Sequence, residues 1–541
     1  MSLRPAFLTS IPVSLLLLFG PAAGAELVTC SAADFGATGR RSDPATRALQ
    51  RAIDACHAKG GGTAYVPPGE YTTGTLELKD NVTLHLEAGA TLFVSQDPAE
   101  FPGMRALIYA RGARRIALRG RGRIDGLARY EWGLPEAHDV EIEREQALAR
   151  EAGVDMRRWL RRGLQALTVV FVKCEDVLIE DVTIENSTLW AIRLFGCDGV
   201  VARGLTIASD LEKAANSDGI DIDGSSNVRI SDCRITTADD AIVLKSGTID
   251  WEPPGETFPV ENVTVTNCVL STSSTAFMIG TESYSDFRHI VFSDSVVRRS
   301  NKGFGINVQD GATVSDVLVS NVTMDLHRRH WNWWGDAEPF YFVLKKRTPQ
   351  SKLGAVRNVV VRNVVARAQG TARILGHAER RLENVTLADV QILMEPEATP
   401  DKRATSGLRA SGVDRLVLRN VDVRWVEDGA EPGWTSALHL ARVKELTLDG
   451  VVTRQAHRGA EAPAVVLEDV DGATVRACRA LPGTGVFLAV RGSASRDVRL
   501  SGNDFSDAER PYVLQEGAPD DSVSALANFP AHEQTEGRVG E

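Results

Sequence analysis

Cysteine is scarce in this sequence, and its spacing excludes a common metal site. An odd number of cysteines cannot pair completely within one chain, and no Cys-x-x-Cys spacing indicates zinc. The 541 residues contain seven cysteines: Cys30, Cys56, Cys174, Cys197, Cys233, Cys268 and Cys478. We interpret the four from Cys174 to Cys268 as small buried core residues, because they lie in or beside strand-like runs. Cys30 and Cys56 are a candidate disulfide pair.

Positive charge is also in short supply. The chain has 61 Lys and Arg against 72 Asp and Glu, which gives a formal net charge of −11. An acidic chain binds nucleic acid and anionic membranes poorly, so we expect neither as a partner. An acidic polysaccharide would need a local cationic patch. The simpler alternative is that the charge only keeps a large protein soluble.

Beyond the N-terminus, the chain lacks any apolar run long enough to span a membrane. Arg4, the apolar stretch Ile11–Phe19 and the small residues Ala23–Ala25 together resemble a secretory signal over residues 1–25. The alternative is a mobile N-terminal tail. We expect a secreted or periplasmic protein after cleavage near Ala25.

What the sequence does contain is a repeat. An Asn or Asp precedes a short Val/Ile-rich run, a polar pair and a second short apolar run. Alternating apolar residues indicate strands with one buried face, and a period of two to four tens of residues indicates a solenoid. A right-handed parallel β-helix, all-β in class, fits better than a β-propeller, which would have more regular blades. Clear copies begin at Asp176, Asn227, Asn262, Asp316 and Asn358.

The composition divides the rest of the chain into segments. The region 26–130 is predicted to contain an N-terminal cap and the first coils, with a capping helix over Asp43–Lys59. The region 131–165 is rich in Glu, Arg, Ala and Leu and is predicted to be a helical insertion. The region 166–528 is the predicted β-helix with the catalytic coils, and 529–541 is a polar tail expected to be disordered.

Three carboxylates stand out from the repeat. Asp218 lies in Asn216-Ser217-Asp218-Gly219, and the pair Asp239-Asp240 follows it after 21 and 22 residues. That separation is about one coil of a solenoid, so the carboxylates should meet side by side. Glycoside hydrolysis requires such carboxylates, because one acid protonates the leaving oxygen and one base activates water.

Around these residues the chain resembles the polygalacturonases of glycoside hydrolase family 28, within the pectate-lyase-like β-helices. The resemblance runs from about Ala33 to Val364. Its Asn-Thr-Asp and Asp-Asp motifs correspond to Asn216–Asp218 and Asp239-Asp240, the latter followed by the typical Ala241–Gly247.

The resemblance implies catalytic roles. Asp239 would be the general acid, and Asp218 and Asp240 would hold the attacking water. It also implies inversion, for which the carboxyl groups should lie roughly 6.5–9.5 Å apart. Strand parity supports Asp239 but would turn Asp240 inward, unless the strand begins with a bend.

The chain departs from the family pattern at two motifs. The family's Gly-His-Gly and Arg-Ile-Lys correspond to Ser274–Ala276 and Gly305–Asn307, so one His and two cations are missing. In the family those cations bind a galacturonate carboxylate, a task that suits Arg and Lys. A rhamnogalacturonan-like substrate is therefore favoured over plain polygalacturonate. The residues expected to contact substrate are Asn216, Lys245, Glu282 and Asn307.

Other features leave alternatives open. Asp221 and Asp223 suggest a calcium loop but lack its full spacing, so we interpret them as outward strand and turn residues and expect no metal and no cofactor. The Trp331–Trp334 segment could stack on sugars or anchor a loop. Lys345–Arg347 could return positive charge to a cleft or form a solvated charge run.

The sequence thus predicts a secreted, monomeric glycoside hydrolase of pectic polysaccharide or oligosaccharide, of galacturonide or rhamnogalacturonan type. Two rivals remain. A polysaccharide lyase is disfavoured by the acidic, cation-poor centre. A non-catalytic β-helix that binds glycans stays open because the family's His and cations are missing.

Overall fold

The computed structural model describes residues 28–133, 147–154, 157–250, 255–329, 335–427 and 429–530. The predicted signal segment 1–25 lies outside these residues, as does most of the predicted tail. Phe529 still donates a backbone hydrogen bond to Asn503, 2.8 Å away.

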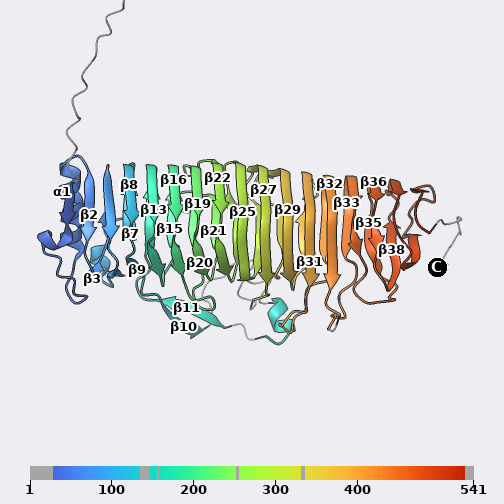
Figure 1. The fold of residues 1–541 in the computed structure, drawn as a ribbon, viewed down its shortest axis with the longest axis horizontal. Helices are drawn as coiled ribbons and strands as arrows, with labels where there is room; N and C mark the ends of the chain where they lie inside the picture. Colours follow the sequence, from blue (N-terminus) through green and yellow to red (C-terminus); the bar gives the residue numbers. More distant parts are fainter. Residues whose placement is uncertain are drawn as a thin grey trace, which may run out of the picture.

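The repeat forms the rungs of a parallel β-helix (Figure 1). The Asn or Asp that opens each copy adopts the left-handed conformation, with φ of 55° at Asn227 and 57° at Asn262. Asn and Asp tolerate this conformation better than other non-glycine residues. Their side chains also stack from rung to rung, since Asn262 donates to Asn227 at 3.0 Å and Asn358 to Asp316 at 2.9 Å. The recurring Asn or Asp at the first position of the repeat therefore lies at a corner of the rung.

Every strand of the β-helix pairs in parallel with strands one rung before and after it, along three faces. The face that we call sheet 1 carries the Asp-rich segments. Its strands are β4 (Leu76–Glu77), β7 (Ala106–Arg111), β12 (Leu167–Val172), β15 (Ile192–Phe195), β18 (Ile220–Asp223), β21 (Ile242–Ser246), β24 (Thr275–Ser283), β26 (Lys302–Val308), β28 (Phe340–Leu344), β30 (Ala372–Leu375), β35 (Pro463–Glu468), β38 (Thr484–Arg491) and β40 (Ala508–Gln515), with the first residues of β32 and β33 completing it.

The other two faces contain the remaining strands of the stack. Sheet 2 comprises β1 (Thr29–Ser31), β2 (Gly62–Val66), β5 (Val82–Leu86), β8 (Arg114–Arg119), β13 (Glu175–Glu180), β16 (Asp198–Arg203), β19 (Ser226–Ser231), β22 (Val260–Thr266), β25 (Phe287–Ser300), β27 (Thr313–Leu326), β29 (Ala355–Ala368), β31 (Leu382–Met394), β32 (Leu408–Trp425), β33 (Leu438–Asp449), β36 (Asp471–Arg476), β39 (Arg496–Ser501) and β41 (Val523–Leu526). Sheet 3 comprises β3 (Gly69–Thr73), β6 (Ala90–Val94), β9 (Arg123–Asp125), β14 (Thr183–Glu185), β17 (Thr206–Ala208), β20 (Arg234–Thr237), β23 (Val269–Thr272), β34 (Val452–Thr453) and β37 (Arg479–Ala480), together with the ends of the long strands β25 to β32.

The core runs along the axis of the stack and is built from inward-facing Val, Ile, Leu and Phe. On sheet 1, Ile220, Ile242 and Phe277 occupy one register position on successive rungs and are fully buried. The predicted all-β fold and parallel β-helix architecture are confirmed.

The N-terminal end is covered by α1 (Thr46–Ala58), which follows the 3₁₀ turn η1 (Ala32–Phe35) (Figure 1). Leu49 and Ile53 of α1 are buried against the first strands. A second 3₁₀ turn, η2 (Pro98–Glu100), follows β6. The amphipathic helix expected over Asp43–Lys59 is present and covers the end of the solenoid.

The predicted helical insertion is only partly helical. Residues 147–151 are helical, but β10 (Arg129–Gly133) and β11 (Arg158–Arg162) pair as an antiparallel ribbon. This ribbon lies outside the stack of rungs (Figure 1). Tyr130, Trp132 and Trp159 supply cross-strand contacts that favour the pairing of the two strands. The composition of the segment as a whole favours helix, so the pairing was not predicted. The residues 134–146 and 155–156 of the segment lie outside the described part.

All seven cysteines are buried and have free thiols. The interpretation of Cys174, Cys197, Cys233 and Cys268 as core residues is confirmed, whereas the candidate Cys30–Cys56 disulfide is not formed. Within the described ranges, no helix is both long enough and apolar enough to cross a membrane.

Candidate active site

The three predicted catalytic carboxylates meet at the start of two neighbouring strands of sheet 1. Asp218 precedes β18, and Asp239 and Asp240 precede β21, one rung further along. The rungs are joined directly at this point, since the backbone N–H of Gly219 donates to the carbonyl of Asp240 at 2.9 Å. Asp218 and Asp239 are buried and Asp240 is half-buried.

Asp240 joins the cluster because the chain bends before β21 begins. The strand starts only at Ile242, and the alternation that would have turned Asp240 inward does not extend back to it. Its Oδ1 accepts hydrogen bonds from the Ser274 hydroxyl at 2.8 Å and from the Thr275 backbone N–H at 2.9 Å. The exception to the predicted inward orientation, a bend at the start of the strand, therefore applies to Asp240.

The carboxylates are closer together than expected. One oxygen from each of Asp218, Asp239 and Asp240 lies within 4.8 Å of the others. The separation of roughly 6.5–9.5 Å expected for an inverting acid and base is therefore not found between these oxygens. Carboxylate oxygens at this spacing could also bind a divalent cation. Lys245 already provides a fixed positive charge, with Nζ 2.9 Å from Asp218 Oδ2.

Lys245 is the electrostatic centre of the site. Its ammonium group also lies 2.8 Å from Asp221 Oδ1 and 3.6 Å from the centroid of the Trp190 ring. Burial alone would lower the pKa of Lys245, but Asp218 and Asp221 outweigh it and raise that pKa well above its usual value. Lys245 therefore remains a cation beside the buried side chains of Asp218 and Asp221.

The same environment favours the protonated form of Asp239. Burial, and then the charges of Asp218 and Asp240, raise the pKa of Asp239 well above its usual value. Burial also raises the pKa of Asp218, although Lys245 opposes the shift. A carboxylic acid beside carboxylates is the arrangement that general acid catalysis needs.

Comparison with known proteins agrees with this geometry. The family described as "Glycosyl hydrolases family 28" matches residues 164–406. A probable polygalacturonase from Vitis vinifera is 27% identical over 319 residues, covering 57% of this chain and 62% of that protein. An exo-poly-alpha-D-galacturonosidase from Dickeya chrysanthemi is 25% identical over 308 residues, half of each chain. This chain is therefore similar to glycosyl hydrolase family 28 over residues 164–406.

Solved structures of family 28 share the fold. The Yersinia enterocolitica family 28 exopolygalacturonase superposes with a TM-score of 0.60 at 21% identity, over 79% of each chain. The Thermotoga maritima exopolygalacturonase gives a TM-score of 0.57 at 24% identity, over 73% of this chain and 91% of that one. The chain therefore spans nearly all of one family 28 structure, but only 62% and 50% of the grapevine and Dickeya relatives.

Asp221 and Asp223 have a different role from the one predicted. Both point outward from the core, but they are buried strand residues of β18 with ion-pair partners. Asp223 Oδ2 lies 2.7 Å from Arg193 Nη2, and Asp221 pairs with Lys245. Both residues lie in β18 beside the carboxylate cluster, so the interpretation as outward strand residues is confirmed and only the interpretation as turn residues is wrong.

The four residues expected to contact substrate divide into two groups. Lys245 and Asn307 are buried on the outward side of sheet 1, and Asn307 Oδ1 has no hydrogen-bond partner among the described residues. Glu282 lies close enough to Lys245 to raise its pKa. Asn216 is exposed, with φ of 57° in the turn before Asp218, so it shapes that turn.

The cations that could have replaced those missing from the family motif are already paired. Arg347 Nε lies 2.8 Å from Asp310 Oδ1, and Lys346 Nζ lies 2.9 Å from Glu379. The prediction that Lys345–Arg347 restores charge to the cleft therefore finds no support in Lys346 or Arg347. Trp331–Trp334 lies outside the described residues.

Sequence reasoning missed the contribution of the β10–β11 ribbon. Tyr130 packs against Ala214 and Ala238, which lie beside Asp218 and Asp239 in the chain. Lys213 Nζ lies 5.0 Å from the centroid of the Trp159 ring. The aromatic residues of the segment were the available signal, but they are few and widely spaced.

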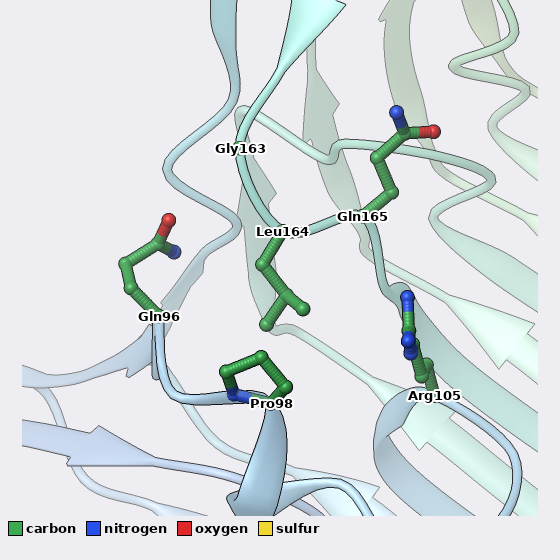
Figure 2. A pocket seen from close by; sticks show the side chains of 6 residues that line it. All are labelled: Gln96, Pro98, Arg105, Gly163, Leu164 and Gln165. Atoms are coloured by element: carbon green, nitrogen blue, oxygen red, sulfur yellow. The ribbon is translucent and has the colours of Figure 1, made fainter.

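A surface pocket opens at the base of this ribbon, with a volume of about 540 Å³. In Figure 2 the side chain of Leu164 points towards Pro98, and Arg105 lies to one side. Arg105 precedes β7, which is three rungs from β18, or roughly 14 Å along the stack. The pocket is therefore separate from the carboxylate cluster. Its lining residues are Gln96, Pro98, Arg105, Gly163, Leu164 and Gln165.

Proposed function

We propose that this protein hydrolyses a galacturonide-type glycosidic bond in pectic polysaccharide or oligosaccharide. The observation that supports this function best is the three-carboxylate cluster, in which the pKa of Asp239 is raised and Asp218 and Asp240 stand within 4.8 Å. The match of residues 164–406 to family 28 and the names of the polygalacturonase relatives support the substrate class.

In the proposed reaction, Asp239 donates its proton to the glycosidic oxygen as the bond to the anomeric carbon breaks. Asp218 and Asp240 together hold one water molecule. Two oxygens within 4.8 Å of each other can both accept hydrogen bonds from one water, because each bond needs about 2.7 Å. The water adds to the anomeric carbon and its proton passes to one of these carboxylates, which completes hydrolysis. Inversion is part of the proposal because the resemblance to family 28 implies it.

Fixed interactions hold each group in its role. Ser274 and Thr275 orient Asp240, and Lys245 holds Asp218. The pKa of the general acid, Asp239, is set by its burial and by the neighbouring charges. Because these positions are set by strands rather than by long loops, the site needs little rearrangement during the reaction.

The lyase alternative requires a base that removes a proton next to a uronate carboxylate. The raised pKa of Asp239 favours an acid at this position and opposes that role. A lyase would also leave an unsaturated product that absorbs ultraviolet light.

The test is product analysis after incubation with polygalacturonate, rhamnogalacturonan and their oligosaccharides. We expect saturated products without new ultraviolet absorbance, and proton NMR of the fresh product should show the inverted anomer. Unsaturated products would favour the lyase, and absence of cleavage would favour a protein that only binds glycans.

Rhamnogalacturonan is a second candidate substrate. It is favoured by the neutral residues Gly305 and Asn307, which stand where family 28 places Arg and Lys. Cleavage of rhamnogalacturonan but not polygalacturonate would support it. We further propose that the protein is exported and acts as a monomer, which N-terminal sequencing of the secreted product and light scattering can test.

A further inference from the structure

The β10–β11 ribbon presents one face to the carboxylate cluster. In its antiparallel register Tyr130 pairs with Arg161, and Trp132 pairs with Trp159. Since alternate residues of a strand share a face, these four side chains lie together. The Trp132 and Trp159 rings meet edge to face at 5.3 Å. The neighbouring Arg162 points to the opposite face and pairs with the exposed Glu131.

Two contacts fix this face against the β-helix. Tyr130 packs against Ala214 and Ala238. Arg161 Nη1 donates to the carbonyl of Thr188 at 3.0 Å. The segment after Thr188 leads directly to the cluster, because the backbone N–H of Ala191 donates to the carbonyl of Asp218 at 2.8 Å.

Arg161 is near the carboxylates but does not bind them. Burial lowers its pKa, while Tyr130, Asp239 and Asp218 oppose that shift, which places its guanidinium within electrostatic reach of both acids. Among the described residues it makes no ion pair with either acid. A guanidinium has five N–H donors, and the bond to Thr188 uses one of them.

We propose that Arg161 binds the carboxylate of a uronate unit at the cleavage site. The inference rests on the proposed function and assigns its specificity to a residue outside the part of the chain that matches family 28. A guanidinium fork suits a carboxylate because it can form two parallel hydrogen bonds. Without such a cation, an anionic sugar would be repelled by Asp218 and Asp240.

Other cations on sheet 1 are less suited to this position. Lys302 stands one rung beyond Thr275, and its ammonium group lies 4.9 Å from the Tyr341 ring. Thr275 itself is one rung beyond Asp240, so Lys302 would contact a different sugar unit. Arg161 therefore supplies, from the ribbon, charge that Gly305 and Asn307 do not provide.

The test is a binding measurement that does not depend on catalysis. Calorimetry would compare the Asp239→Asn protein with the Asp239→Asn/Arg161→Gln protein, using a galacturonic acid trisaccharide and its methyl ester as ligands. A charge-assisted hydrogen bond contributes about 1.5–3 kcal/mol, so removing Arg161 should weaken binding of the acid about 10- to 100-fold. Binding of the ester should change less than threefold on the same scale.

Two further variants make the result specific. Arg161→Lys keeps the charge but loses the fork and should restore part of the affinity for the acid. Arg162→Gln removes an arginine from the opposite face of the ribbon and should leave both affinities unchanged. Equal losses for acid and ester, or no loss, would overturn the role of Arg161 while hydrolysis by the unmodified protein still supports the proposed function. Failure of the Asp239→Asn protein to bind either ligand would overturn the inference, and absence of hydrolysis would then overturn the function as well.

Discussion

At the scale of the residue, the pKa values of the catalytic acids depend on the buried ammonium group of Lys245. Lys245 pairs with Asp218 and Asp221, both buried, and is itself covered by Trp190. Lys245 lowers the pKa of Asp239, but burial and the neighbouring acids raise that pKa by more. The result is that the pKa of Asp239 is raised well above its usual value, while Lys245 opposes the upward shift at Asp218.

This balance predicts the pH dependence of catalysis. Activity requires a protonated Asp239, so it should fall as pH rises through the raised pKa of that acid, and it should fall at low pH when Asp218 gains a proton. Lys245 opposes the upward shifts of both Asp239 and Asp218. In Lys245→Met both pKa values should therefore rise, and both limbs of the kcat/KM profile should move to higher pH.

The measurement is kcat/KM against pH for the two proteins, after circular dichroism shows that the variant is folded. Lys346→Met is the control, because Lys346 pairs with the exposed Glu379, and its profile should not move. A Lys245→Met profile that stays in place or moves to lower pH would contradict the electrostatic account.

At the scale of the element, the rungs beneath the site depend on stacked phenylalanines. Phe277 of β24 stacks between Phe292 at 4.8 Å and Phe304 at 5.7 Å. The same strand begins with Thr275, whose backbone N–H binds Asp240. Strand β24 thus contributes both to packing inside the β-helix, through Phe277, and to the orientation of Asp240, through Thr275.

Phe277→Ala should therefore reduce both stability and activity. Removing a buried phenylalanine costs about 3–5 kcal/mol, which denaturant unfolding followed by circular dichroism would detect. Phe529→Ala is the matched control, because Phe529 is 65% exposed and its loss should cost far less. Equal effects of the two substitutions would show that the stack does not support the site.

The comparison of sequence and structure also belongs to this scale. The strands were predictable because many repeat copies begin at a left-handed Asn or Asp, such as Asn262, and continue with inward Val or Ile. The spacing of Asp218 and Asp239 similarly predicted that they meet. The orientation of Asp240 was not predictable, because the bend before Ile242 depends on bonds from Ser274 and Thr275 in the next rung.

The ribbon could not be recognised for a related reason. Its stability comes from pairs such as Tyr130 with Arg161, which are far apart in the chain. Local composition between them favours helix, and residues 147–151 are indeed helical. Likewise, the ion pairs of Asp221 and Asp223 become visible only when Lys245 and Arg193 are placed beside them.

At the scale of the whole molecule, the described rungs form one continuous stack that carries the carboxylate cluster on sheet 1. The described rungs run from β1 to β41, and the cysteines lie buried along them as free thiols. Burial should therefore protect these thiols as long as the stack is folded.

Alkylation followed by mass spectrometry tests this description. The folded protein should react little with iodoacetamide, and the denatured, unreduced protein should gain seven labels, one for each free cysteine. Addition of a reductant should not increase that number. Five labels before reduction and seven after it would show that two cysteines, Cys30 and Cys56 among the candidates, form a disulfide.

The central claim is that Asp239 is the acid of a glycoside hydrolase site, and the most direct test is the rate of oligogalacturonide cleavage by Asp239→Asn. The account predicts a loss of about 10²- to 10⁴-fold in kcat, because asparagine cannot donate the proton. Asp520→Asn, an exposed position far along the stack, should retain the full rate. Cleavage by Asp239→Asn at the rate of the unmodified protein would contradict the account.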